Sequence, residues 1–321
     1  MKIKNLKWLA LVLALFLIAA ELFARFYLGL GTPPLFITHP TIEYLLKPDQ
    51  DVYRFGNHVL VNHYGMRTEN FETKKTNNRQ IRVMVFGDSV INGGSLTDHN
   101  ALATTLLQSY WQQKTGQPVI VGNISAGSWG PGNWLAYAKE YGFFDADIIV
   151  LIVSSHDAYD TPTFEALNPD THPLQQPYSA LIEGINRYLP RYLPDWLTQK
   201  TVLKVETTTP TKNTASLEDL NQFLDLAKAK VGKVIVFQYP TKLEAESGNM
   251  EEGYQEMTTL LTKKNVTIIP LQSIFHNQLA KQELYRENDK IHPNLLGQKL
   301  ISGTISNNMP NMWLNSSKSI N

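Results

Sequence analysis

The chain has 321 residues, of which 43% are apolar and 18% are charged, a composition typical of a globular protein with a substantial core. Lysine and arginine together number 29, as do aspartate and glutamate, so the charge balance gives no electrostatic reason to expect a nucleic-acid partner. Cysteine is absent, which excludes disulfide bonds, thiolate metal sites and a cysteine nucleophile.

The N-terminal segment has the composition of a membrane anchor. Three lysines among the first seven residues precede an unbroken run of 13 apolar residues, 8–20, and apolar residues continue to Leu30. The 23 residues from Trp8 to Leu30 are enough to cross a bilayer at about 1.5 Å per residue. Glu21 and Arg25 lie one helical turn apart, and their side chains are expected to pair or to reach the membrane interface.

No pattern typical of a signal-peptidase site precedes Glu21, so we expect residues 1–30 to remain as an uncleaved signal anchor, with a removed signal peptide as the alternative. The positive charge on the N-terminal side of the anchor predicts that this side is cytoplasmic. The chain would then be a single-pass protein of the cytoplasmic membrane with an extracytoplasmic domain, which is periplasmic if the source is a Gram-negative bacterium.

Residues 31–80 are predicted to form a membrane-proximal extension. Four prolines between residues 33 and 48 disfavour long helices, and the apolar run 59–61 is typical of a strand. Arg67 is expected to stabilise the junction with the next part of the chain, for instance by pairing with a carboxylate. Contact with a substrate is the alternative for this residue.

Residues 81–310 alternate apolar runs with stretches of helical composition. The predicted strands are 81–86, 118–121, 147–153, 233–237 and 266–269, and the predicted helices are 100–114, 133–143, 217–230, 250–263 and 295–305. This alternation predicts an α/β fold in which helices cover both faces of a parallel sheet. Five strands fit a flavodoxin-like, three-layer α/β/α arrangement, in which sites form beyond the carboxyl ends of the strands.

The interval between the third and fourth predicted strands is unusually long. This insertion, at about residues 157–215, contains repeated prolines and a predicted short helix at 179–188. A long insertion beside the end of a strand can act as a lid or a wall of a substrate site, or it can support the extension. Both interpretations stay open from the sequence. Residues 311–321 are predicted to form a loose tail.

Ser89 follows the first predicted strand of the sheet directly and therefore lies at its carboxyl edge. A serine hydroxyl is a poor nucleophile until a base removes its proton. Asp289 and His292 lie three residues apart before the last helix. In a turn, this spacing lets the carboxylate reach one imidazole nitrogen while the other faces the cleft. Ser89, His292 and Asp289 are therefore the predicted catalytic triad.

A triad also requires donors for the negative charge that develops on the substrate oxygen. Gly127 follows the second predicted strand, and its N–H is open to a ligand because glycine has no side chain to block the approach. The backbone N–H of Ser89 is the second predicted donor. His156 follows the third strand, which places it over the same cleft.

These residues resemble the SGNH, or GDSL-type, hydrolase family, which is named for serine, glycine, asparagine and histidine in four sequence blocks. The tripeptide Gly-Asp-Ser that ends at Ser89 is similar to the first block, Gly127 matches the glycine of the second, and Asp289-x-x-His292 matches the last. The resemblance covers roughly residues 81–305. It implies a hydrolase of the α/β/α fold that acts on ester bonds.

The third block departs from the family pattern, which reads Gly-x-Asn-Asp and whose asparagine donates to the oxyanion. This chain has Ser154-Ser155-His156-Asp157 instead. A neutral imidazole can also donate a hydrogen bond, so the resemblance implies that His156 replaces the asparagine as an oxyanion donor. A protonated His156 would stabilise the oxyanion more strongly, and activity would then fall as the pH rises.

Two further residues beside these motifs are predicted to contact the substrate. Trp129 could stack on a sugar ring, and Asp157 is a candidate substrate-binding residue, whereas the alternatives are core packing for the tryptophan and a structural hydrogen bond for the aspartate. His156, Asp157 and Asp160 match no recognised ligand pattern, so neither a metal ion nor another cofactor is predicted.

The resemblance and the anchor together imply a serine-dependent ester hydrolase or O-acyl transferase that acts on acyl, notably acetyl, esters of an extracytoplasmic polysaccharide. One alternative is a lipid esterase or lysophospholipase, which an apolar groove in the insertion would favour, whereas a polar groove would favour a glycan. The other alternative is a non-catalytic, glycan-binding scaffold of the same fold. The missing asparagine favours this scaffold, and the intact triad disfavours it.

Overall fold

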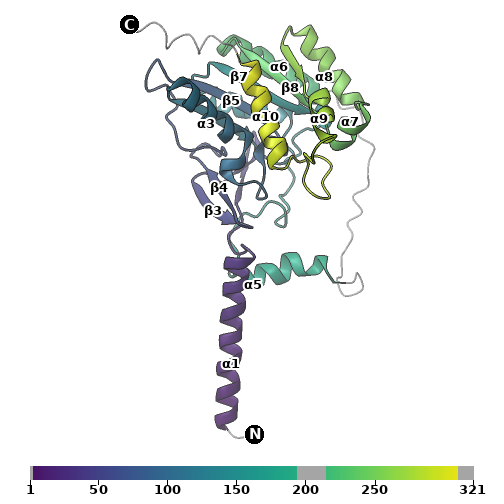
Figure 1. Ribbon diagram of the computed structural model, residues 1–321. Helices are drawn as coiled ribbons and strands as arrows, with labels where there is room; N and C mark the ends of the chain where they lie inside the picture. Colours follow the sequence, from purple (N-terminus) through teal and green to yellow (C-terminus); the bar gives the residue numbers. More distant parts are fainter. Residues whose placement is uncertain (1–2, 194–214, 310–321) are drawn as a thin grey trace.

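A five-stranded parallel sheet forms the centre of the molecule (Figure 1). The computed structural model describes residues 3–193 and 215–309 of the chain. The strands of the sheet are β5 (Ile81–Gly87), β6 (Val119–Ser125), β7 (Ile148–Ser154), β8 (Val234–Tyr239) and β9 (Thr267–Pro270). Their spatial order is β6-β5-β7-β8-β9. β6 is added on one side of β5 and the later strands on the other, so the strand order reverses beside β5. This is the strand order of a flavodoxin-like fold, and it confirms the predicted fold class.

The two faces of the sheet carry separate hydrophobic cores because successive residues of a strand point to opposite sides. In β5, Val83 and Val85 belong to one core, and Met84 and Phe86 belong to the other. The first core is covered by α3 (Ala103–Thr115), α7 (Lys242–Ser247), α9 (Gln272–Leu279) and α10 (Leu295–Asn308). The second is covered by α4 (Pro131–Tyr141), α6 (Ala215–Lys230) and α8 (Glu252–Lys263).

The five predicted strands and five predicted helices of this domain are all present, with ends that differ by a few residues. The largest difference is in β6, which was predicted to end at residue 121 and continues to Ser125. Three short helices were not predicted: α7, α9 and α2 (Ser89–Asn92). They contain six, eight and four residues, too few for a helical repeat of apolar residues to be evident in the sequence.

The extension folds into two small antiparallel sheets against the main domain. One pairs β1 (Phe36–His39) with β2 (Glu43–Leu46), and the other pairs β3 (Gln50–Arg54) with β4 (Asn57–Val61), which contains the predicted strand 59–61. Tyr44, Leu45 and Met66 belong to the same hydrophobic core as α4. The extension therefore packs on the sheet domain through shared apolar contacts instead of being joined to it by a loose linker.

α1 (Ile3–Leu22) projects away from the rest of the molecule and continues into a short π-helical turn, η1 (Phe23–Tyr27) (Figure 1). Among the described residues, Leu6–Tyr27 is the single helical stretch long and apolar enough to cross a membrane, and only 6% of its apolar window is buried. Such exposure is not that of a core helix, and it fits a membrane span or a signal sequence. Arg25 donates to Glu21 at 2.9 Å, as predicted.

The helical part of the insertion packs against the extension. It consists of α5 (Ala180–Glu183), η4 (Gly184–Tyr188) and η5 (Leu189–Arg191). Glu183 accepts hydrogen bonds from the backbone N–H of Gly31 at 2.7 Å and from the guanidinium of Arg54 at 2.9 Å. These helices therefore support the extension, which is the second of the two interpretations of the insertion. Residues 194–214 and the predicted tail 311–321 lie outside the described residues.

Candidate active site

Ser89 begins the short helix α2 at the carboxyl end of β5, the second strand of the sheet. Asp88 caps this helix, because its Oδ1 accepts a hydrogen bond of 2.8 Å from the N–H of Val90. Gly93 ends it in the left-handed conformation, with φ of 72°, which glycine adopts readily. The strand, the cap and the terminating glycine together place the half-buried Ser89 at the edge of the sheet where a ligand can approach.

The carbonyl groups of the α2 turn are held by side chains from distant parts of the chain. A helix leaves its last carbonyl groups without partners inside the helix, and buried carbonyl groups require one. The donor–carbonyl pairs are Gln298 with Val90 (3.0 Å), Asn123 with Ile91 (2.8 Å), Arg67 with Asn92 (3.0 Å) and Arg286 with Gly93 (2.7 Å). Because these donors come from four separate segments, the turn that carries Ser89 is fixed before any ligand binds.

Arg67 has the predicted structural role, although its partners are different from those expected. The side chain is buried, and it donates to the carbonyl oxygens of Asn92 and Gly94 instead of pairing with a carboxylate. Burial disfavours its charge and lowers its pKa to about 10, so the guanidinium is still cationic at neutral pH. Arg67 therefore joins the extension to the turn that follows Ser89.

The structure brings the three predicted triad residues together. His292 Nε2 lies 2.9 Å from Ser89 Oγ, and His292 Nδ1 lies 2.7 Å from Asp289 Oδ2. Both distances are those of hydrogen bonds, and the imidazole connects the hydroxyl to the carboxylate. This arrangement allows proton transfer from Ser89 to His292 while Asp289 fixes the imidazole tautomer.

Asp289 is held as a carboxylate by the turn it belongs to. Its Oδ1 accepts hydrogen bonds from the N–H groups of Ile291 at 2.8 Å and His292 at 2.9 Å. Burial opposes the charge, but these backbone bonds and the contact with His292 outweigh burial and hold the pKa of Asp289 below its usual value. The residue is therefore ionised at neutral pH and can stabilise an imidazolium on His292.

Two predicted oxyanion donors lie at the ends of neighbouring strands. Ser89 is the first residue of α2, where a backbone N–H has no acceptor inside the helix. Gly127 follows β6, and no heavy atom would lie within 4 Å of a Cβ built on it, so the space beside its backbone is open. The carbonyl of Gly127 accepts a hydrogen bond from the hydroxyl of Tyr44, which holds this loop in place. The oxyanion role of both N–H groups stays a prediction.

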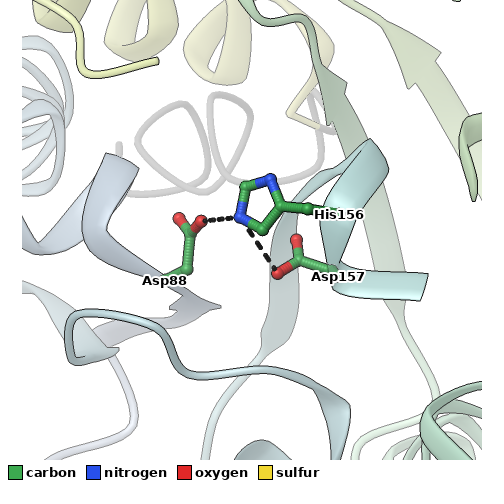
Figure 2. Close-up of side chains that lie close together, drawn as sticks. All are labelled: Asp88, His156 and Asp157. Atoms are coloured by element: carbon green, nitrogen blue, oxygen red, sulfur yellow. Dashed lines mark hydrogen bonds and ion pairs between the residues drawn. The ribbon is translucent and has the colours of Figure 1, made fainter. Parts of the chain in front are cut away.

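His156 lies in η3 (Ser155–Ala158), directly after β7, and its ring faces Asp88 (Figure 2). Its Nε2 is 3.0 Å from Asp88 Oδ2, 3.9 Å from Asp157 Oδ1 and 3.8 Å from Asp160 Oδ2. Burial alone would lower its pKa, but the hydrogen bond with Asp88 and the charges of the three carboxyl groups outweigh burial and raise the pKa to about 10. His156 is therefore an imidazolium at neutral pH.

The contact with Asp88 limits what His156 can do as an oxyanion donor. The proton on Nε2 is donated to Asp88, so only the proton on Nδ1 is left for another acceptor. The oxyanion role of His156 stays a prediction, and it requires that Nδ1 be the donor. The hydrogen bond itself makes His156 a partner of Asp88, the residue that caps α2 and precedes Ser89.

Asp157 does not lie on a surface that a substrate can reach, so the predicted substrate contact is wrong. The side chain is fully buried, and its Oδ2 accepts a hydrogen bond of 2.6 Å from the N–H of Ser154. Burial raises the pKa of Asp157 well above its usual value. The alternative, a structural hydrogen bond at the start of η3, describes this residue.

The predicted contact between Trp129 and a sugar ring is also wrong. Trp129 is 1% exposed, and its indole N–H donates to the carbonyl of Tyr44 at 3.2 Å. Trp134, a second tryptophan of this region, is buried as well and donates to the carbonyl of Gly87 at 3.0 Å. Both rings pack in the core beneath the site because their apolar area is worth more when buried than when exposed to water.

Asp88, His156 and Asp157 offer three ligand atoms within 4.8 Å of one another, and a metal ion at this site would be held by them. Metal binding requires a neutral imidazole, and the raised pKa of His156 favours a proton on Nε2 instead. The negative charge of the carboxyl groups around the ring can be balanced by the proton on His156. The predicted absence of a metal ion stays a prediction.

Sequence reasoning missed most of the residues that hold the site. Asn123, Gln298 and Arg286 donate to the carbonyl groups of the α2 turn, and none of them belongs to a recognisable motif. Arg286 also donates to Thr97 at 2.7 Å, and its backbone N–H donates to the carbonyl of His292 at 3.0 Å. The proximity of Arg286 to Asp289 and His292 in the sequence was the only available signal.

No protein-family model matches the chain, and no curated protein does. Solved structures that are similar in fold include an acetylxylan esterase from Geobacillus stearothermophilus, in a catalytic-mutant form, with 12% identity over 73% of this chain and 95% of that chain and a TM-score of 0.47. A two-domain esterase active on acetylated mannans has 12% identity over 75% of this chain and 50% of that chain, with a TM-score of 0.46. A member of the lipolytic protein G-D-S-L family from Veillonella parvula has 12% identity over 71% of this chain and 98% of that chain, with a TM-score of 0.44. At these values, neither activity nor substrate is carried over to this chain.

Proposed function

We propose that the chain is a serine-dependent ester hydrolase with Ser89, His292 and Asp289 as its catalytic triad. The observation that carries the proposal is the pair of hydrogen bonds on one imidazole, 2.9 Å to the Ser89 hydroxyl and 2.7 Å to the Asp289 carboxylate. Ser89 lies 203 residues before His292, and Asp289 lies 3 residues before it. Local chain geometry alone therefore does not explain why Ser89 contacts His292.

In the proposed reaction, the Ser89 oxygen attacks the ester carbonyl carbon while His292 Nε2 accepts the hydroxyl proton. The tetrahedral intermediate collapses, the carbon–oxygen bond to the alcohol breaks, and the alcohol leaves with the proton from His292. Water then attacks the acyl-serine with His292 again acting as the base, which releases the acid and restores the serine. A sugar hydroxyl in place of water would make the same chain an O-acyl transferase.

The oxyanion of the intermediate would be stabilised by the N–H groups of Ser89 and Gly127. The open space beside Gly127 supports this role because a substrate oxygen can approach the backbone there. His156 would contribute from its Nδ1 side or, through its ion pair with Asp88, by holding the turn in which the Ser89 N–H lies. The second contribution is the one that the contact between these two residues supports.

We further propose that α1 is a retained membrane anchor. Glu21 accepts hydrogen bonds from the backbone N–H groups of Ala180 and Leu181, at 3.0 and 2.9 Å. Ala24 and Leu30 pack with Ala180 in a small core of their own. The end of the apolar helix is therefore built into the folded part of the molecule. A signal peptide that is removed has no reason to make such contacts.

For the substrate we propose an acyl ester, notably an acetyl ester, of an extracytoplasmic polysaccharide. Asp160 is partly exposed and lies 3.8 Å from His156 Nε2, and a polar side chain there suits a hydrated substrate with a small acyl group. A lipid ester is the second candidate, since the anchor would keep the site close to a bilayer. A non-catalytic scaffold is the third, and the triad distances disfavour it.

Fluorophosphonate labelling of the purified full chain in detergent tests the proposal, because this probe reacts with an activated serine. We expect labelling of the wild type, none of Ser89→Ala and strongly reduced labelling of His292→Ala. Ser95→Ala is the matched control, since it removes a hydroxyl near α2 that lies outside the triad. A folded wild type that resists the probe would favour the scaffold instead.

The substrate class is tested by comparing release of acetate from acetylated xylan with release of fatty acid from lysophosphatidylcholine. Faster turnover of the glycan supports the proposal, and faster turnover of the lipid supports the second candidate. Adding a non-acetylated oligosaccharide separates the two reaction types, because a transferase moves the acetyl group to it whereas a hydrolase releases acetate at the same rate.

A further inference from the structure

The helical segment 180–193, which we call the junction segment, exposes apolar side chains on one side. Ile182, Ile185 and Leu189 are 46%, 48% and 44% exposed, and Tyr192 and Leu193 at its end are exposed as well. Residues spaced three and four apart share one side of a helix. In water, an ordered segment with several apolar side chains facing outward is unfavourable unless something covers them.

The opposite side of the junction segment is polar or small, and the folded domain holds it firmly. Glu183 is buried and pairs with Arg54 across 2.5 Å, and Arg187 donates to Glu183 at 3.2 Å. Ala180 is fully buried, and the hydroxyl of Tyr188 accepts from Arg54 at 2.7 Å. The outward position of the apolar side therefore follows from fixed ion pairs on the inner side and is not an accident of a loose loop.

The junction segment begins where α1 ends. The backbone N–H groups of its first two residues, Ala180 and Leu181, donate to the Glu21 carboxylate. From there α5 runs across the axis of α1, below the domain and beside the end of the apolar helix (Figure 1). The apolar side of the segment therefore lies at the depth at which α1 would leave a membrane.

Aromatic side chains of η1, which continues α1, mark the same depth. Phe23, Phe26 and Tyr27 are 53%, 79% and 77% exposed, and Trp8 near the other end is 70% exposed. Trp8 and Tyr27 are separated by a helical rise of about 28 Å at about 1.5 Å per residue, close to the thickness of a bilayer core. Aromatic residues are typical of the two membrane–water interfaces.

From these observations we infer that the junction segment is an in-plane membrane helix, seated on the same bilayer that α1 crosses, with Ile182, Ile185 and Leu189 in the boundary between headgroups and acyl chains. The inference rests on the proposed anchor. A segment with a polar inner side and an apolar outer side, lying across a spanning helix, has the properties of an interfacial helix. The occupant is lipid and not a second copy, because the segment begins against Glu21 and Ala24, at the end of the helix that would cross the bilayer.

The absence of cysteine in the chain makes a direct test simple, because one introduced cysteine is the only labelling site. The full chain is reconstituted in phosphatidylcholine vesicles with an environment-sensitive fluorophore at Ile185→Cys or Leu189→Cys. Lipids with a nitroxide close to the headgroup are the quencher. We expect these lipids to quench both labels at least twofold more strongly than a label at Tyr110→Cys, an exposed position on α3.

A label at Leu13→Cys, in the middle of α1, separates failure of this inference from failure of the anchor. Quenching of Leu13→Cys by deeply placed nitroxides, without quenching at positions 185 and 189, would overturn the membrane seat and leave the anchor intact. Absence of quenching at all three positions would overturn both. Concentration-dependent disulfide cross-linking at Leu189→Cys without lipid quenching would show that a second copy covers this side, and would also overturn the inference. Fluorophosphonate labelling of the same variants reports on the triad independently.

Discussion

His156 Nε2 lies 3.0 Å from Asp88 Oδ2, and this ion pair joins the ends of the neighbouring strands β7 and β5. The other oxygen of Asp88 caps α2, whose first residue is Ser89. A charge on His156 therefore acts on the turn that positions Ser89. His156 is a titratable group that contacts the residue next to Ser89 and lies outside the proposed triad.

The first prediction concerns pH. The pKa of His156 in the folded protein is raised to about 10, above the usual value of 6.5. Protonation therefore favours the folded arrangement, and this contribution is complete below about pH 6.5 and is lost as the pH rises through about 10. We expect kcat to fall over the upper part of this range with little change in KM, measured with a soluble acetyl ester.

Lysine and tyrosine side chains also titrate near pH 10, so variants of His156 are the control. The pH profile of His156→Asn should lack the part of the fall that comes from the imidazolium, and this variant should keep more activity than His156→Ala. Loss of a hydrogen bond to a charged group corresponds to roughly a 10- to 100-fold decrease in kcat for the alanine variant. Wild-type and His156→Asn profiles that coincide up to pH 10.5 would remove His156 from the mechanism.

The second prediction concerns Asp289. Replacing it by asparagine keeps the shape but allows a donor to face His292 Nδ1, which favours the wrong imidazole tautomer. We expect Asp289→Asn to lower kcat by roughly 10³–10⁴-fold, as measured by steady-state ester cleavage. Asp225→Asn, at an exposed carboxylate that pairs with Lys264, is the matched control and should be active. Activity of Asp289→Asn within tenfold of the wild type would speak against a triad.

The third prediction concerns the support of the α2 turn. Asn123 is fully buried, and its amide donates to the carbonyl of Ile91 at 2.8 Å and to the Thr104 hydroxyl at 3.1 Å. Asn123→Ala leaves these buried acceptors without a donor, and we expect it to lower the free energy of unfolding by about 1–3 kcal/mol. Denaturant titration measures this loss, and Gln222→Ala, at an exposed position on α6, should change it by less than about 0.5 kcal/mol.

The fourth prediction compares two glycines. A Cβ at Gly127 would meet nothing within 4 Å, and φ is not positive there, so Gly127→Ala should fold with almost unchanged stability. The methyl group would nevertheless occupy the open space in which we place the substrate oxygen. We therefore expect kcat/KM to fall by roughly tenfold or more while the melting temperature is kept.

Gly253 gives the opposite outcome and serves as the comparison. A Cβ there would lie 2.1 Å from the carbonyl oxygen of Ser155, in the turn that carries His156. Gly253→Ala should therefore be strongly destabilising, and it should lose activity together with stability. A Gly127→Ala variant with full activity would show that its N–H is not an oxyanion donor.

The sheet and its helices could be predicted because buried parallel strands consist of apolar runs, and those runs are evident in the sequence. The triad could be predicted because parallel strands end at one edge, so a residue after β5 and a turn before α10 share a location. The end of β6 could not be predicted, since Asn123 and Ser125 are polar residues that the sheet buries. The Asn123 amide donates to the carbonyl of Ile91 in α2, and the Ser125 hydroxyl donates to Asn123 within the strand.

Burial by contacts that the sequence does not reveal also explains the two wrong predictions. Trp129 and Asp157 lie in loops beside the site, where sequence reasoning expects contact with a ligand. Their burial depends on what packs over those loops, namely Tyr44 of the extension for Trp129 and α6 for Asp157, whose carbonyl accepts from the Ser216 hydroxyl. Such contacts between distant segments leave no local pattern. The partners of Arg67 and the contact of α5 with Glu21 could not be predicted for the same reason.

The extension connects the nucleophile turn to the apolar helix through a series of rigid contacts. Arg67 holds the carbonyl of Asn92, and Asn57 of β4 holds the carbonyl of Ser95 at 3.1 Å. On the same hairpin, Arg54 forms an ion pair with Glu183, a buried residue of the insertion. With α1 in a bilayer, Ser89 would therefore lie at a constant distance from the lipid surface. Esters of a long polymer would contact Ser89 only as they pass at that distance from the membrane, and esters farther from the membrane would not reach it.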